Sequence, residues 1–139
     1  MKKSILPVIL LLCTALIVIF SCHKKGPPIN YGGKFDGLWT GINSCDSQTH
    51  TINIASPVDN VNSVYYTGHT DTGFCSRSIT FVGTAYGDTI LFPATVYTDS
   101  CGNGYTVQQV GTIIGVTLVL TRITTGTIND TCVFMATKY

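Results

Sequence analysis

The feature that most constrains this chain is a succession of short strand-like segments that begins near residue 35 and runs to the end. Residues 78–86 alternate with the period of a strand that buries one face, and that face would hold Ile79, Phe81, Gly83 and Ala85. Residues 89–97 repeat the alternation, and there we expect the inner face to hold Ile90, Phe92, Ala94 and Val96. Gly87-Asp88 separates the two segments as a turn.

Eight such segments are predicted, at residues 35–45, 48–55, 61–68, 78–86, 89–97, 105–112, 116–123 and 129–138. Threonine, tyrosine, valine and isoleucine recur between turns, and almost nothing in the sequence favours a helix. The sequence therefore predicts an all-β fold: an antiparallel eight-stranded meander that closes as a barrel or flattens towards a sandwich.

The N-terminus has a different character. Lys2 and Lys3 precede an apolar run over residues 5–20, which is on the short side for a spanning helix of about 20 residues. This pattern predicts a secretory signal peptide over residues 1–21, with an uncleaved membrane anchor as the alternative. Without the two leading lysines, six basic residues face seven aspartates, and no basic patch indicates a nucleic-acid partner.

The end of the apolar run, Ile19-Phe20-Ser21-Cys22, resembles a bacterial lipobox, although Phe20 departs from the usual small or polar residue. The resemblance implies cleavage before Cys22, a diacylglycerol on its thiol and acylation of the new amine, which together give firm anchoring. An ordinary cleavage site with Cys22 as a free or paired thiol is the alternative. Residues 22–34 then form a flexible linker and residues 35–139 the domain.

This anchor implies a location. The residues after Cys22 are His-Lys-Lys, without the acids that mark surface export in some bacterial lineages. We therefore expect a lipoprotein of the outer membrane that faces the periplasm, with surface exposure as the alternative.

Four of the six cysteines lie in the predicted domain, namely Cys45, Cys75, Cys101 and Cys132. An even set in an exported domain indicates two disulfides, and no Cys-x-x-Cys spacing indicates zinc or redox chemistry. Four cysteines permit three connectivities. In a meander, Cys75 and Cys101 flank the open end of the hairpin that turns at Gly87-Asp88, so they are one expected pair.

Closure of the meander would place the first and last strands side by side. Pairing Cys45 with Cys132 then sets Gly41 opposite Ala136, because antiparallel partners keep a constant sum of residue numbers. This register uses both strands along their length, so Cys45–Cys132 is the second expected pair.

Gly37-Leu38-Trp39, within FDGLWTG, resembles the opening motif of lipocalin-like barrels, and residues 112–120 with Asp130-Thr131-Cys132 are similar to small lipocalin-like bacterial lipoproteins. The resemblance implies that Trp39 is a structural plug at one end of the barrel. It also implies an arginine stacked on that Trp, a place Arg122 could take. The same segment looks like the first strand of avidin-like barrels, but the chain has a single Trp, so biotin binding is not carried over.

Candidate chemistry is sparse. His69 and Asp71 with His50 could form a metal site, but a solvated loop is the favoured interpretation. The alternate Asp, Cys and Asn of residues 99–103 are spaced as in calcium loops, yet a disulfide-pinned turn is favoured there. We therefore expect no metal site, no cofactor and no catalytic residues.

Three function classes follow. The first is a lipid-anchored, non-catalytic module that binds a small apolar ligand or an envelope protein. The second is an inhibitor or assembly partner that acts through its loops, and a hydrolase is a distant third. A ligand-binding barrel should have an apolar cavity that opens away from Trp39, whereas a loop-driven partner should have a filled interior and an exposed aromatic patch. The residues that test this are Tyr65, Tyr66, Tyr97 and Tyr105.

Overall fold

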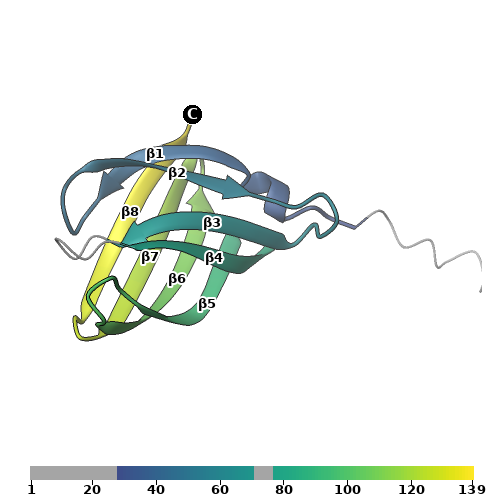
Figure 1. The fold of residues 1–139 in the computed structure, drawn as a ribbon. Coiled ribbons are helices and arrows are strands. Elements are labelled where there is room, and N and C mark those ends of the chain that lie inside the picture. The colour runs from purple at the N-terminus through teal and green to yellow at the C-terminus, as the bar shows by residue number, and fades with distance from the viewer. Residues whose placement is uncertain (1–27, 71–76) are drawn as a thin grey trace, which may run out of the picture.

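The computed structural model describes residues 28–70 and 77–139, and in it one antiparallel sheet closes on itself as an eight-stranded barrel (Figure 1). The strands follow one another in chain order around the barrel, so the predicted all-β meander is confirmed and its closed form is the one adopted. They are β1 (Gly37–Asn43), β2 (Thr49–Ala55), β3 (Ser63–Thr70), β4 (Arg77–Tyr86), β5 (Thr89–Thr98), β6 (Gly104–Ile114), β7 (Thr117–Gly126) and β8 (Asp130–Lys138).

One short helix precedes the barrel. The 3₁₀ helix η1 (Gly32–Lys34) occupies residues that the sequence predicted as flexible linker. Its Gly32 N–H donates a hydrogen bond of 2.8 Å to the carbonyl oxygen of Val61, which ties it to the connection between β2 and β3. Phe35, the residue directly after the helix, is fully buried, so this segment packs against the barrel.

The barrel closes between its first and last strands. Gly41 lies opposite Ala136, the register predicted from the cysteines, and a disulfide joins Cys45 to Cys132 with a Cα–Cα distance of 5.3 Å. A Cβ on Gly41 would clash with the backbone carbonyl of Met135. Glycine is therefore required at this position of the β1–β8 pair.

Trp39 lies in the barrel core, only 2 % exposed. Its indole N–H donates a hydrogen bond of 2.7 Å to the carbonyl oxygen of Phe35, which satisfies the one polar group of the ring. The ammonium of Lys138 lies 5.5 Å from the centre of the indole ring. This placement fits a structural plug.

The cation over Trp39 is Lys138 and not Arg122, the arginine that the resemblance allowed for that place. The pairing of β1 with β8, which we call the seam, places Trp39 opposite Lys138. The pairing of β7 with β8 places Arg122 opposite Cys132, near the other end of the barrel. The position of each cation therefore follows from strand pairing.

The inner face of β4 is as predicted, since residues 79, 81, 83 and 85 are all buried. On β5 the expectation fails halfway: Ile90 and Phe92 are fully buried, but Ala94 and Val96 are exposed. The pairing of β5 with β6 shifts between Phe92 and Thr95, around Pro93, which has no N–H for the ladder. The shift reverses the side-chain phase and brings Tyr97 inward.

Candidate functional site

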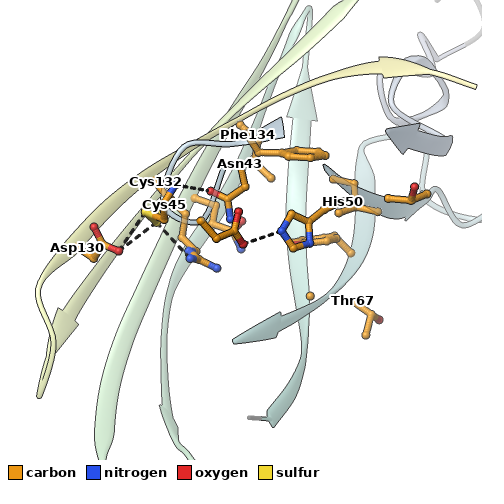
Figure 2. Close-up of a pocket in the computed structure, with 15 residues that line it drawn as sticks. Asn43, Cys45, His50, Thr67, Asp130, Cys132 and Phe134 are labelled. Atoms are coloured by element: carbon orange, nitrogen blue, oxygen red, sulfur yellow. Dashed lines mark hydrogen bonds and ion pairs between the residues drawn. A yellow bond between two sulfur atoms is a disulfide. The ribbon is translucent and has the colours of Figure 1, made fainter. Parts of the chain in front are cut away.

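A cavity of about 310 Å³ lies at the end of the barrel where β1 leads into β2 (Figure 2). Asn43, at the end of β1, lines it, whereas Trp39, near the start of the same strand, does not. We call this end the open end, and the end that holds Trp39 and η1 the closed end. The cavity therefore lies away from Trp39, where the sequence argument expected a ligand-binding barrel to open.

A row of inward side chains crosses three strands in the cavity wall. Gln109 on β6 pairs with Arg122 on β7, and Arg122 pairs with Cys132 on β8. Gln109 is only 2 % exposed, and its side-chain nitrogen Nε2 has no hydrogen-bond partner. The Nε of Arg122 is also buried without a partner, and its Nη2 lies 3.2 Å from the sulfur of Cys132. Both residues therefore line the cavity, and each has one buried nitrogen without an acceptor.

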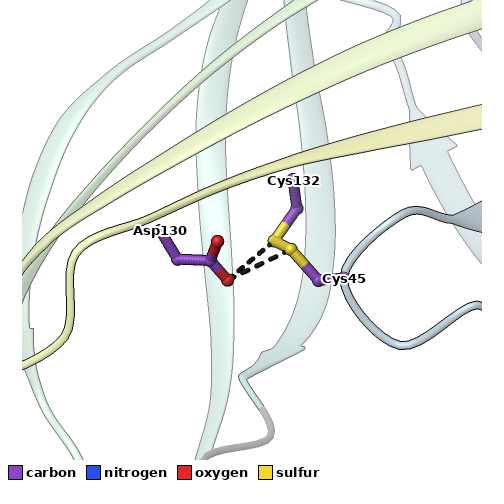
Figure 3. A group of neighbouring side chains, drawn as sticks. All are labelled: Cys45, Asp130 and Cys132. Carbon is purple, nitrogen blue, oxygen red and sulfur yellow. Dashed lines mark hydrogen bonds between the residues drawn. A yellow bond between two sulfur atoms is a disulfide. The ribbon is translucent and has the colours of Figure 1, made fainter.

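The disulfide forms the next part of this wall (Figure 3). Oδ2 of Asp130 lies 3.1 Å from the sulfur of Cys45 and 3.2 Å from that of Cys132. Disulfide sulfurs carry no proton, so they cannot donate hydrogen bonds to this carboxylate. The three side chains have the composition of a metal site, with all ligand atoms within 4.8 Å of one another, but in the disulfide neither sulfur is a thiolate ligand.

An acid and a histidine flank the wall at the turn from β1 to β2. Nε2 of His50 lies 2.7 Å from Oδ2 of Asp46 (Figure 2). The N–H of Gln48 holds the pKa of Asp46 below its ordinary value, burial opposes this, and His50 lowers the pKa further. A metal site of His50 with His69 and Asp71 was considered and a solvated loop was favoured; Asp71 and the side chain of His69 lie outside the part of the chain that the structure describes.

Apolar side chains make up another part of the lining. Phe134 and Leu120 lie on β8 and β7, one inward position deeper than Cys132 and Arg122, and Ile52 projects from β2. Tyr66 from β3 stacks on Phe81 with ring centres 5.7 Å apart. Burial raises the pKa of Tyr66, and the positive charge of Arg122 partly opposes this. The cavity is therefore mixed, not the purely apolar one expected of a ligand-binding barrel.

The loop from β5 to β6 is a turn held by Asp99. Its carboxylate accepts hydrogen bonds of 2.9 Å from the N–H groups of Cys101 and Asn103 and from the Asn103 amide, and one of 3.2 Å from the Tyr105 hydroxyl. Because both oxygens are engaged within the loop, the turn interpretation fits better than a calcium site. Cys101 is disulfide-bonded. Its expected partner, Cys75, lies outside the described residues, as does Cys22.

The four tyrosines chosen as a test do not form an outer patch. Tyr97 and Tyr105 are buried and stacked with ring centres 5.2 Å apart, and Tyr66 lines the cavity. Tyr65 alone is exposed, at 41 %.

Gln109 was not predicted as a cavity residue, and Arg122 was considered only as a partner of Trp39. A signal for both was present. Gln109 falls in phase with the buried Val107, and Arg122 in phase with the buried Leu118 and Leu120. A polar side chain at an inward position of a strand marks either a paired interior group or a site.

In the described part of the chain, no helix combines the length and the apolar character that crossing a membrane requires. No family model, no curated protein and no solved structure matches this chain. A function can therefore be inferred only from the sequence and from the geometry of the cavity.

Proposed function

We propose that this chain is a lipid-anchored, non-catalytic binding protein of a bacterial outer membrane, built as a lipocalin-like barrel that takes a small molecule into its open end. The observation that carries the proposal is the cavity in which Gln109 and Arg122 present buried donors without partners. Buried polar groups in folded proteins are nearly always hydrogen-bonded, and exceptions call for an explanation. A bound ligand is that explanation here.

The size of the cavity supports a small ligand. An eight-stranded barrel is just wide enough to fill itself or to hold one small molecule. The cavity volume of about 310 Å³ falls at the low end of the range for ligand pockets, about 300–1,000 Å³.

The lining favours binding over catalysis. The two cavity sulfurs are joined in a disulfide, so neither is a thiolate nucleophile. The hydroxyl of Thr51 pairs with that of Thr40 at 2.8 Å, and the hydroxyl of Thr67 pairs with that of Thr80 at 3.3 Å. The imidazole of His50 meets Asp46 instead of a hydroxyl that it could activate.

The same observations weigh against an inhibitor that acts through its loops. That function would be supported by a filled interior and an aromatic outer patch, whereas the cavity is open and Tyr97 and Tyr105 are buried. The small-molecule function is the better supported of the two.

The anchor is argued from the sequence. The lipobox-like residues 19–22 support lipid on Cys22, and the His-Lys-Lys that follows supports a periplasm-facing location. Cys22→Ala should release the chain from the membrane fraction or leave an unprocessed precursor. Metabolic labelling that finds no acyl chain on the unaltered protein would remove this part of the proposal.

Native mass spectrometry tests the binding function. The protein should be purified from its own envelope in mild detergent and compared with a sample that has been unfolded, stripped and refolded. We expect a small-molecule mass on the native sample that is absent from the stripped one. A native sample without such a mass, but with a protein partner bound in fixed ratio, would favour the loop-driven function instead.

A further inference from the structure

The cavity also indicates the chemical class of its ligand. We infer that the ligand is a small monocarboxylate, whose carboxylate is bound by Arg122 and Gln109 and whose short apolar body rests on Leu120 and Phe134. This inference depends on the proposed binding function and deepens it.

The first step is the convergence of the two donors. Gln109 and Arg122 are direct cross-strand partners on β6 and β7, and both side chains line the cavity. Such partners have Cβ atoms about 4.5–5.5 Å apart, so one ligand group can reach both. The matching group has two acceptor oxygens and no proton of its own to place, which describes a carboxylate.

The second step is charge. An arginine side chain is always protonated in proteins. Among the described residues, no carboxylate lies within the ion-pair distance of 4.0 Å of the Arg122 guanidinium. In the part of the chain that the structure describes, the one hydrogen-bond contact of its side chain is with the sulfur of Cys132, which is a weak acceptor. A partly buried cation that the described residues leave without a directly contacting carboxylate favours an anionic ligand.

The third step is the placement of the acids. Asp130 lies two residues from Cys132 towards the β7–β8 turn, and Asp46 lies in the turn from β1 to β2, so both lie on the open side of Arg122. Asp46 already has hydrogen bonds with His50 and with the N–H of Gln48. Asp130 lies against the two disulfide sulfurs, which cannot donate to it. Two negative groups near the entrance disfavour a dianion such as phosphate more than a monoanion.

The fourth step is the apolar floor. Leu120 and Phe134 are 3 % and 8 % exposed and lie one inward position below the donors. They offer a surface to a hydrocarbon body, and the cavity volume of about 310 Å³ limits that body to a short one.

Calorimetric titration of the full-length chain in detergent tests the inference, with detergent alone as the blank. The probes are hexanoate and hexanamide, which match in size and differ in charge, and inorganic phosphate. Charge-assisted hydrogen bonds correspond to about tenfold to hundredfold in affinity. We therefore expect hexanoate to bind at least about tenfold more tightly than hexanamide, and more tightly than phosphate.

Three variants locate the effect. Arg122→Met should abolish the preference for hexanoate, and Gln109→Met should reduce hexanoate affinity by a smaller factor. The matched control is Lys34→Met, which removes an exposed cation at the closed end and should leave binding unchanged. If Arg122→Met does not fold, Arg122→Lys keeps the charge without the Nε–H donor and should bind hexanoate more weakly than the unaltered protein. The comparison of hexanoate with hexanamide needs no variant.

The outcomes that would contradict this inference can be distinguished from those that would contradict the proposed binding function. Equal binding of hexanoate and hexanamide would overturn the carboxylate and leave a small-molecule site. Tighter binding of phosphate would overturn it in favour of an inorganic anion. No binding of either organic probe would also overturn it, and the native mass spectrum would then decide separately whether the cavity holds another ligand.

Discussion

The closed and open ends of this barrel treat their interior polar groups in opposite ways. At the closed end the indole N–H of Trp39 has its acceptor in Phe35, and Lys138 covers the ring. At the open end Nε2 of Gln109 and Nε of Arg122 have no acceptor. Unpaired groups at the closed end, on Ser56 and Asn62, belong to the connection between β2 and β3 and not to the barrel wall. The difference teaches that the closed end satisfies its interior polar groups, whereas the open end leaves some unsatisfied at a cost in stability, as the proposed binding site would require.

The largest expected effect is at the plug. Trp39→Ala should lower the free energy of unfolding by about 3–5 kcal/mol, because it removes a buried aromatic and leaves a cavity. Urea denaturation followed by circular dichroism measures this. In the unaltered protein, Trp39 fluorescence should be blue-shifted and poorly quenched by iodide. Tyr139→Ala, at a residue 98 % exposed, is the control and should change stability by no more than about 0.5 kcal/mol. A freely quenched Trp39 in the folded protein would contradict the plug.

The second largest effect on stability is expected from the disulfide between Cys45 and Cys132. Replacing both Cys45 and Cys132 by serine should cost about 2–5 kcal/mol, because the bond closes a long loop of the unfolded chain, with a sequence separation of 87. The double variant should keep the native emission of Trp39, since the disulfide lies at the open end and Trp39 at the closed end. A red shift of the native emission would show that the two ends are not independent.

A smaller effect depends on pH at the turn from β5 to β6. Burial raises the pKa of Asp99, but hydrogen bonds from the Asn103 side chain, from the N–H groups of Asn103 and Cys101 and from Tyr105 outweigh it, so the pKa lies below the ordinary 3.8. The unfolded chain then binds more protons than the folded one, so this stabilisation is present above about pH 4 and is lost as pH falls through the lowered pKa.

Asp99→Asn tests that contribution, because an amide does not titrate and places an NH₂ against donors of the loop. The variant should melt at a lower temperature than the unaltered protein at pH 7, and the two should converge as pH falls below about 4. Asp59→Asn removes an exposed acid from the connection between β2 and β3 and serves as the control. A difference that persists unchanged at low pH would assign the effect to packing.

The fold could be predicted from the sequence more fully than the site. Alternation and turn residues are local signals, and the cysteines fixed the seam register of Gly41 with Ala136. The prediction for β5 failed at Pro93, because one shift in pairing reverses the phase of every later side chain. The site could not be predicted in the same way. Whether Gln109 and Arg122 have partners depends on strands far apart in sequence, and only the closed barrel shows that they do not.

The smallest expected effect on the free energy of unfolding is at Gln109. It distinguishes the two ends of the barrel most clearly, because this substitution should not destabilise the protein, whereas the others should. Gln109→Met replaces a buried amide that has an unpaired donor with an apolar side chain of similar length. Replacing an unsatisfied polar group in this way is neutral or stabilising, so we expect the free energy of unfolding to stay level or to rise by up to about 1 kcal/mol. The same variant should bind hexanoate more weakly.

The neighbouring Gln108 is exposed on the outer face of the same strand, so Gln108→Met is the matched control. It should change stability by no more than about 0.5 kcal/mol and leave hexanoate binding intact. Denaturation and titration of the three proteins under one set of conditions give both quantities. A binding residue at position 109 predicts that hexanoate affinity falls while stability is kept or rises in Gln109→Met, and that neither changes in Gln108→Met. If Gln109→Met instead destabilised the barrel by more than about 2 kcal/mol, the amide would be a structural group comparable to the Trp39 indole, since breaking a satisfied buried hydrogen bond has a cost of that order.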